Sequence, residues 1–483
     1  MLLNVRPMYL ISYLWNYTRI IWKGLKLYKT IEDPVDEHKL NKIVETMLPY
    51  VQNCGCVFIK FFQWTTPILD LLFNKERKNP YWLKQMEKFY ENCDDHVLEH
   101  TLNIYKADFG EELQEEYELL DIIGSGSIGQ VYKGKHKRTK QLVAIKVLHP
   151  GVKYEMKLFK NFIWLLYNTP FLRDIIHSIL PLDIPKFVEL FEKQVNMNYE
   201  ASNLSYMSNV YKDNDFIHIP SLVKFSENIM IMEFEEGLSI DDESLNDYNR
   251  MKIVTVLSIF SRHNFEISHF NHGDIHKGNW KLQPHKNTYR IVFYDFGFCW
   301  ALRDTSITEL LTEAFTDSTP EDYSKLIKLS CNLLNDHTDE LKRLFVDYFH
   351  DHFQKADFTD PGPLITGILH ISKQRDIIIN PIALQCLLAY LQVYKYLDIY
   401  NLTNSGNTNK SNFRCFREST IHVLNVCNTY DIFPEIQESI KTKLNETQIE
   451  IKHIFDTVDE SIQNTDEIRS LINFSNEPLK EQK

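Results

Sequence analysis

Two carboxylates and one amide lie along residues 272–297 at a spacing that few folds require. A His-Gly-Asp tripeptide ends at Asp274, Asn279 comes five positions later, and Asp295 begins an Asp-Phe-Gly sequence after a short apolar run. Phosphoryl transfer in kinases needs these groups at this spacing: one Asp orients the acceptor, and an Asn and a second Asp bind the metal. An ordinary surface loop is the alternative for the tripeptide alone.

The second motif is a glycine-rich segment that follows the apolar run 117–123. It has the pattern G-x-G-x-x-G-x-V, and its expected nucleotide contacts are Gly124, Gly126, Ser127, Gly129 and Val131. Glycines let a backbone turn tightly and bring its N–H groups close to phosphate oxygens. A dinucleotide-binding fold would need a helix after the last glycine. Residues 130–134 instead alternate like a strand, which favours a hairpin over the nucleotide.

The third motif is a lysine on the predicted strand 141–148. We expect Lys146 to contact the α- and β-phosphates and to be held by a Glu on a helix, with Ala144 beside the nucleotide. A solvent-exposed strand lysine is the alternative. Glu233 ends the apolar run 229–233 and marks the hinge whose backbone would bind adenine. The order of the motifs predicts an α+β fold of the two-lobed protein-kinase type, with a mostly helical C-lobe.

Departures from the ordinary kinase pattern indicate which group of kinase-like proteins this chain resembles. A predicted helical stretch, residues 152–185, separates the strand lysine from its helix, where residues 194–203 read Gln-Val-Asn-Met-Asn-Tyr-Glu-Ala-Ser-Asn. Residues 58–64 read Phe-Ile-Lys-Phe-Phe-Gln-Trp. These features resemble the UbiB/ADCK family of atypical kinases, the aarF-domain-containing kinases. The resemblance covers roughly residues 45–300, and the family pattern H-x-D-x-H-x-G-N is intact.

The family motifs match only in part. The K-x-G-Q motif matches at Lys60 and Gln63, with Phe62 where Gly is expected. The E-x-D-x-x-x-E-A-x-N helix pattern matches from Glu200 onward, but its first two acids are Gln194 and Asn196.

In the family, the K-x-G-Q segment covers the active site and is tied to the two acids. Amides in place of carboxylates exchange hydrogen bonds worth about 1.5–3 kcal/mol for bonds nearer 0.5–1.5 kcal/mol. We therefore expect a cover held more by packing than by charge, with looser access to the γ-phosphate. Neutral drift is the alternative.

Composition excludes some partners. The net charge is −13 and the pI about 5.8, so a nucleic-acid partner is not expected. The eight cysteines are scattered, which disfavours structural zinc and a disulfide framework. The first 29 residues carry five basic residues and no acid. This segment predicts an amphipathic helix on a lipid surface, an organellar presequence, or a helix packed on the core.

The predicted organisation has five parts. They are a basic amphipathic segment (1–34), a helical extension with the K-x-G-Q-like motif (35–116), a kinase-like N-lobe (117–237), a C-lobe (238–400), and a polar linker with C-terminal helices and tail (401–483). The apolar run 381–400 contains several polar residues, so a buried helix is expected there and not a membrane span.

The resemblance implies an ATP-binding phosphotransferase or ATPase that uses Mg²⁺, with Lys146, Glu200 and Asp274 catalytic and Asn279 and Asp295 on the metal. It further implies a role in isoprenoid-quinone or other lipid metabolism, inside the cell at a membrane, with mitochondria an option in a eukaryote. A nucleotide-binding pseudokinase scaffold and a true protein kinase are the alternatives. The sequence leaves the phosphoryl acceptor and the oligomeric state open.

Overall fold

The computed structural model describes residues 7–399, apart from 29–36, 74–79, 91–94, 213, 215, 267, 286–287, 302–306, 308–309, 312–313, 315–321 and 354–360. The chain divides into two compact units, each built from segments far apart in sequence. Unit 1 comprises Met1–Ala201, Leu222–Phe234 and Ile365–Pro381, and unit 2 comprises Ser202–Ser221, Glu235–Leu364 and Ile382–Lys483. Each unit is described by itself. The five predicted part boundaries remain predictions.

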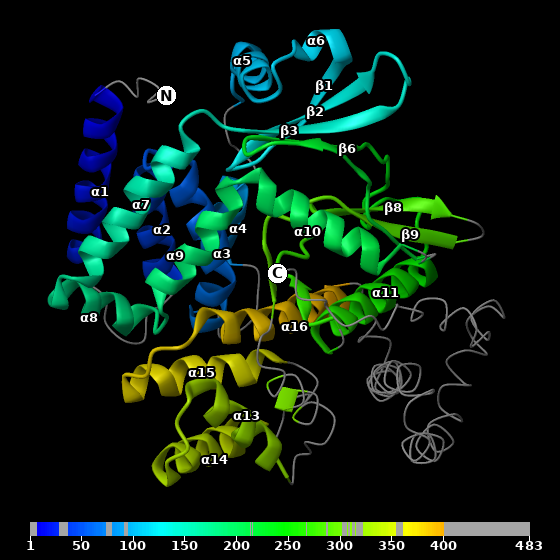
Figure 1. Cartoon of the computed structure of the whole chain (residues 1–483). Helices are drawn as coiled ribbons and strands as arrows, with labels where there is room; N and C mark the ends of the chain where they lie inside the picture. Colours follow the sequence, from blue (N-terminus) through cyan, green and yellow to red (C-terminus); the bar gives the residue numbers. More distant parts are fainter. Residues whose placement is uncertain are drawn as a thin grey trace, which may run out of the picture. The chain divides into compact units, whose positions relative to one another are not determined.

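Unit 1 contains a five-stranded antiparallel sheet in the order β1-β2-β3-β6-β5 (Figure 1). The strands are β1 (Tyr117–Ser125), β2 (Gly129–His136), β3 (Leu142–Leu148), β5 (Leu222–Phe225) and β6 (Ile229–Glu233). The Val- and Ile-rich runs of β3 and β6 favour the extended conformation. Because side chains alternate along a strand, Val143, Ile145 and Val147 share one face and Lys146 takes the other.

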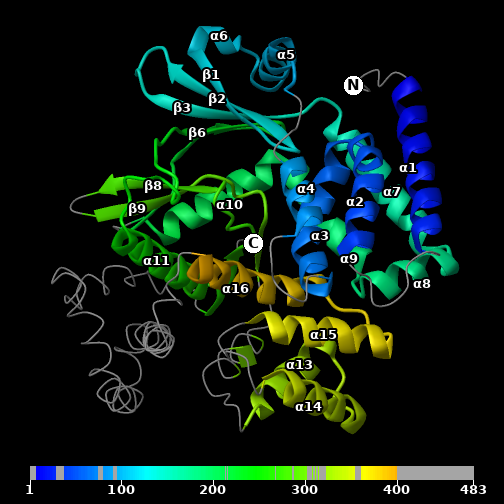
Figure 2. The same cartoon turned by 180° about the vertical axis from the view of Figure 1, so that it is seen from behind.

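The apolar face of this sheet is covered by two short helices, α5 (Leu98–Phe109) and α6 (Leu113–Glu116), as Figures 1 and 2 show. Tyr105 of α5 and Leu113 of α6 are fully buried against Ile145 and Ile231. The face that carries Lys146 is therefore the one opposite α5 and α6.

Unit 1 also contains helices in two stretches, one before the sheet and one after β3. They are α1 (Pro7–Tyr28), α2 (Glu37–Gln52), α3 (Cys56–Phe73), α4 (Tyr81–Tyr90), α7 (Val152–Tyr167), α8 (Pro170–Ile179) and α9 (Ile184–Glu192), followed by a 3-10 turn (Lys193–Val195). The helix α10 (Met197–Val210) begins in unit 1 and continues in unit 2.

The basic N-terminal helix α1 is two-sided. Tyr17 is buried and stacks on Phe162 of α7, with ring centroids 4.5 Å apart. The indole of Trp15 is 64% exposed and that of Trp22 is 53% exposed. One face of α1 therefore packs on the core, while the other presents tryptophans to solvent.

Among the described residues, α3 alone is long and apolar enough to cross a membrane by length and composition. Its aromatic side chains contact α7 and α9: Phe61 lies 5.3 Å from Phe159, and Trp64 stacks on Phe187 at 3.5 Å. Within unit 1, α3 is packed as a core helix.

Unit 2 combines helices with short sheets. The strands β8 (Trp280–His285) and β9 (Thr288–Phe293) form a hairpin that β4 (Ile217–His218) extends, and β7 (Phe270–His272) pairs with β10 (Cys299–Ala301). The helices are α11 (Asp247–Glu266), α13 (Ser324–Leu334), α14 (Asp339–Phe353), α15 (Pro361–Arg375), which crosses into unit 1, and α16 (Pro381–Ile399).

The α+β class predicted from the sequence is confirmed. The helix expected over 381–400 is α16, and Leu384, Cys386 and Leu387 on it are at most 1% exposed. The predicted linker and C-terminal helices, residues 401–483, lie outside the described residues.

Candidate active site of a kinase-like domain

A buried ion pair links the strand lysine to the helix glutamate in unit 1. Lys146 lies on β3 opposite Val131 of β2 and Met230 of β6. Its Nζ donates to Oε1 of Glu200 at 2.6 Å, and the Glu200 side chain is only 2% exposed. A carboxylate so buried requires a charged or hydrogen-bonding partner, because its desolvation costs several kcal/mol. The pair fixes the position of the lysine ammonium.

The glycine-rich segment forms the turn between β1 and β2. The Gly126 N–H donates to the Gly129 carbonyl at 3.0 Å, which closes the turn. A Cβ added at Gly129 would lie 2.6 Å from the Val147 carbonyl oxygen, so only glycine permits β2 to approach β3 there. This close approach brings the turn beside the Lys146 strand. The sequence motif identified Gly129 as a nucleotide contact, and the structure shows that this glycine also lies close to the backbone of β3.

Two buried histidines that no motif identified support this turn. Nε2 of His149 lies 2.8 Å from the Gly126 carbonyl oxygen, and Nδ1 of His149 lies 2.9 Å from Nδ1 of His96. Because a carbonyl only accepts, His149 carries a proton on Nε2. Burial lowers its pKa, which favours the neutral ring with Nδ1 as the acceptor. His96 must therefore donate from Nδ1, which leaves its Nε2 as an acceptor. Both imidazoles are neutral in this arrangement.

The rest of the network satisfies that assignment. Thr101 Oγ1 donates to His96 Nε2 at 2.8 Å, and it accepts from the Tyr132 hydroxyl at 3.0 Å. The Tyr132 oxygen accepts from the Gln130 side-chain amide at 2.7 Å. Burial lowers the pKa of His96 to about 4 and also lowers the pKa of His149. Burial thus favours the neutral state of both rings on which this assignment of donors rests.

The K-x-G-Q-like segment lies on α3 and reaches the glycine-rich turn. The Ser127 hydroxyl, which is 4% exposed, donates to Oε1 of Gln63 at 3.3 Å. Lys60 lies one turn earlier on the same helix. Gln194 is buried in the 3-10 turn, and the side chain of Asn196 accepts from the Asn198 N–H at 3.0 Å, at the start of α10.

A carboxylate that the motif search missed lies at the first turn of α3. Glu155 of α7 accepts from the Val57 N–H at 3.4 Å and from the Tyr13 hydroxyl of α1 at 2.5 Å. Negative charge at a helix N-terminus is favourable. Burial raises the pKa of Glu155, while the hydrogen bond from Tyr13 opposes that change. Glu155 joins α1, α3 and α7, and no short-range sequence pattern signals it.

The predicted hinge residue ends β6. Glu233 lies opposite Val143 of β3, and its Oε1 accepts from the Gln141 side-chain amide at 2.8 Å. Ala144, the next residue of β3, is 4% exposed and lies opposite Met232. These residues belong to unit 1, together with Lys146 and the glycine-rich turn.

In unit 2, hydrogen bonds hold the two carboxylate-bearing segments together. Asn279 donates from Nδ2 to the Asp274 carbonyl at 2.9 Å, and the Asn279 carbonyl accepts from the Tyr294 N–H at 3.0 Å. The Asp295 carboxylate accepts from the Gly297 N–H at 2.9 Å. Pairing of β7 with β10 adds a further link on the other side of Asp274. Asp274, Asn279 and Asp295 are therefore positioned by one hydrogen-bonded framework.

The two histidines of the catalytic motif differ. His272 is 2% exposed, packs edge-on against Phe296 at 5.5 Å, and accepts at Nδ1 from the Asp274 N–H at 3.3 Å. Burial lowers its pKa, so it organises the loop as a neutral ring. His276 is half-exposed, and its Nε2 lies 3.6 Å from Oδ2 of Asp274.

The donor set suits Mg²⁺ completed by a bound phosphate. Among the described residues, no group of three or more His, Cys, Asp or Glu side chains could hold a metal ion. Asn279 uses its amide nitrogen on the Asp274 carbonyl, which leaves Oδ1 to serve as a ligand atom, and Asp295 offers a carboxylate. Mg²⁺ prefers oxygen ligands and is commonly held by one or two protein groups plus phosphates and water.

Comparison with known proteins identifies the family. The sequence model of the ABC1 atypical kinase-like domain matches residues 88–330, half of the chain. The chain belongs to this family. UbiB/ADCK is another name for the family with this aarF-type domain. The predicted kinase-like fold and the predicted family are therefore confirmed.

The relatives are distant. The chain is 28% identical over 250 residues to a probable serine/threonine-protein kinase, abkC, of Dictyostelium discoideum, covering 49% of this chain and 34% of that protein. It is 24% identical over 333 residues to AarF domain-containing kinase 1 of Drosophila melanogaster, covering 65% and 59%. Further relatives are named mitochondrial in fission yeast and chloroplastic in Arabidopsis thaliana. The match thus spans about a third to three fifths of these two relatives' own length.

Among solved structures, the complex of Rv3197 with erythromycin from Mycobacterium tuberculosis is similar, with a TM-score of 0.42 and 17% identity. The match covers 68% of this chain and 86% of that one.

Proposed function

We propose that this kinase-like protein binds ATP with Mg²⁺ and transfers or hydrolyses its γ-phosphate. The observation that carries the proposal is the ion pair between Lys146 and Glu200, held at 2.6 Å with the carboxylate buried. A lysine placed in this way on the third strand, beside a glycine-rich turn, is the arrangement that orients the α- and β-phosphates in kinases.

Each polar group then has one task. Lys146 holds the α- and β-phosphates, and the turn of Gly126 covers them. Asn279 and Asp295 hold Mg²⁺, which supplies charge neutralisation when it is bound. Asp274 orients the acceptor hydroxyl or a water, and Nε2 of His276 lies 3.6 Å from its carboxylate.

We further propose a lipid or other small molecule as the phosphoryl acceptor, at an organellar membrane. The support is the resemblance to UbiB/ADCK kinases, the mitochondrial and chloroplastic relatives, and the exposed face of α1. On that face Lys26 lies 3.7 Å over the ring of Trp22, and Trp15 is exposed as well. Tryptophan and lysine side by side are typical of helices that lie in a membrane interface.

ATP hydrolysis by the full chain tests the first proposal. We expect turnover in Mg²⁺ that falls at least a hundredfold in Asp295→Asn, whereas Asp322→Asn, an exposed acid elsewhere in unit 2, leaves it unchanged. Equal turnover in both variants would exclude the assignment. Absent turnover with intact ATP binding would instead favour the nucleotide-binding scaffold. Label transferred to protein acceptors, and to no lipid or phenol, would favour a protein kinase.

Vesicle sedimentation tests the membrane proposal. We expect the chain to sediment with anionic vesicles, and the double variant Trp15→Ala/Trp22→Ala to remain in the supernatant. Both tryptophans are exposed, so the variant keeps the packed face of α1. Equal sedimentation of both proteins would contradict a role for this face.

A further inference from the structure

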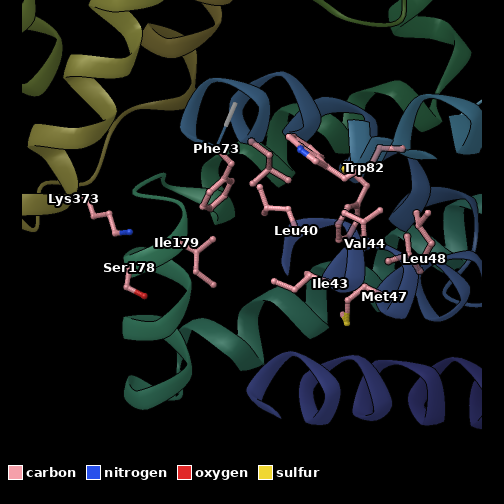
Figure 3. A pocket seen from close by; sticks show the side chains of 14 residues that line it. Leu40, Ile43, Val44, Met47, Leu48, Phe73, Trp82, Ser178, Ile179 and Lys373 are labelled. Carbon is pink, nitrogen blue, oxygen red and sulfur yellow. The ribbon is translucent and has the colours of Figure 1, made fainter. Parts of the chain in front are cut away.

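Unit 1 contains an apolar cavity of about 530 Å³ that the nucleotide chemistry does not use. Its walls come from α2, α3 and α4, and its edge comes from α8 and α15 (Figure 3). Leu40, Val44, Phe73 and Trp82 are typical of the lining. Small-molecule sites commonly enclose about 300–1,000 Å³ and are mostly apolar. The cavity has the size and the lining of a ligand site.

Some of the lining side chains are only partly covered by their neighbours. Leu40, Trp82 and Met86 are buried in one cluster, while Val44 and Phe73 pack against it and remain only partly buried. These helices thus leave apolar surface facing the cavity. An apolar void offers water no hydrogen-bond partners, so its natural occupant is apolar.

The cavity is polar at one end only. Ser178 of α8 and Lys373 of α15 are its polar lining residues, and Figure 3 shows both at the end opposite Met47 and Leu48. The lining contains no Asp or Glu. A cavity with a lysine at one end and hydrocarbon along the rest matches an amphiphile with one chain and an anionic head.

The volume argues against a partner helix as the occupant. An α-helix with its side chains is about 10–12 Å wide and rises 5.4 Å per turn, so roughly one turn would fill the cavity. One turn is too short to be recognised as a helix. An extended hydrocarbon chain uses the same volume along its length.

We propose that this cavity binds a single-chain anionic amphiphile, with the chain between α2, α3 and α4 and the head group at Lys373. The site is separate from the residues assigned to nucleotide and metal, and it does not depend on that assignment. It also gives a role to one departure from the K-x-G-Q motif. Phe62, where glycine is expected, is part of the cavity wall, and the next residue, Gln63, contacts the glycine-rich turn.

The test is a titration of the delipidated full chain with saturated fatty acids of increasing length, kept below their micelle concentrations. Quenching of tryptophan fluorescence reports binding, because Trp82 is in the wall. We expect one site per chain, with affinity rising about fourfold for each added methylene until the cavity is full, and then levelling off. Absence of saturable binding, or affinity that keeps rising with chain length as in simple partitioning, would overturn the proposal.

Variants then locate the site. Val44→Phe fills the cavity and should weaken binding at least tenfold. Lys373→Glu should weaken fatty acids and alkyl phosphates about tenfold but leave the fatty alcohol of the same length unchanged, while Lys186→Glu, an exposed lysine on α9, changes neither. Unchanged binding in both Val44→Phe and Lys373→Glu would refute the site. Thermal stabilisation by Mg-ATP, measured on the same samples, tests nucleotide binding independently of amphiphile binding. The two proposals can therefore fail one without the other.

Discussion

Two neighbouring parts of unit 1 are held by different kinds of interaction. The Lys146–Glu200 pair depends on charge: one ammonium and one buried carboxylate meet at 2.6 Å. The α3 segment that carries Lys60 and Gln63 packs the rings of Phe58, Phe61 and Trp64 against α7 and α9, and its first turn donates to the Glu155 carboxylate. It contacts the glycine-rich turn through the neutral hydrogen bond from Ser127 to Gln63, at 3.3 Å.

The difference shows which departures a chain of this family tolerates. A group that must hold a phosphate has to keep its charge, because no packing can replace it. The α3 segment contacts its neighbours through aromatic rings as well as through polar groups. The amides at Gln194 and Asn196 fit this reading: one is buried and the other caps α10. A cover held more by packing and looser access to the γ-phosphate both remain hypotheses.

The largest effect on stability is expected from Lys146→Met. The change removes the cation beside a carboxylate that is 2% exposed, which should cost about 3–5 kcal/mol of unfolding free energy. The matched control is Lys153→Met. Lys153 pairs with Glu227 at 2.7 Å, but that carboxylate is 58% exposed, so we expect a loss of at most about 1 kcal/mol. Urea unfolding measures the free energy of unfolding of both variants. Equal losses would show that the buried pair is worth no more than the exposed one.

Packing of α3 is tested by Phe58→Ala. Phe58 is 4% exposed and contacts the rings of Tyr17, Phe159 and Phe162. Its truncation should cost about 3 kcal/mol of unfolding free energy. Trp164→Ala, at a ring that is 65% exposed, should cost less than about 0.5 kcal/mol. If urea unfolding gave the two variants the same free energy of unfolding, the aromatic packing of Phe58 would not stabilise α3.

The polar support of the glycine-rich turn predicts a dependence on pH. His96 has a pKa of about 4 in the folded protein, against about 6.5 when unfolded, so the unfolded state binds more protons between these values. Stability should therefore rise from pH 4 to pH 6.5, on the order of 1–3 kcal/mol, and be constant above. The lowered pKa of His149 acts in the same direction, and Asp95 opposes it.

The variant His96→Gln, which cannot be protonated, should reduce this slope. At pH 8 it should differ from the native chain only by the lost hydrogen bonds. Unfolding by urea at several pH values provides the measurement, and an unchanged slope in the variant would show that His96 does not contribute.

The smallest effect is expected from restoring the family's acids with Gln194→Glu and Asn196→Asp. Because rings hold α3, the double variant should change unfolding free energy by about 1 kcal/mol or less and ATP affinity by less than about threefold. Calorimetric titration with nucleotide measures the affinity. A tenfold gain would show that charge, and not packing, limits this segment.

Residues with a local signature were predictable from the sequence. The alternating Val-Ala-Ile-Lys run placed Lys146 on β3, and the glycine pattern placed the β1–β2 turn. His96 and His149 were not predictable, because they are 53 positions apart and belong to no motif. Glu155 was missed for the same reason, since its contacts lie on α1 and α3. The cavity could not be predicted from the sequence, because it depends on how tightly five separate helices pack.

Lys146 and Asp295 are both assigned to one function, the binding of Mg-ATP. The direct test is a thermal-shift cycle with the native chain, Lys146→Met, Asp295→Asn and the double variant. At Mg-ATP a hundred times above its Kd, the native chain should gain about 2.7 kcal/mol. Each single variant should lose most of that gain, and the double variant should lose no more than the singles combined. A gain that persists in both single variants would contradict the account.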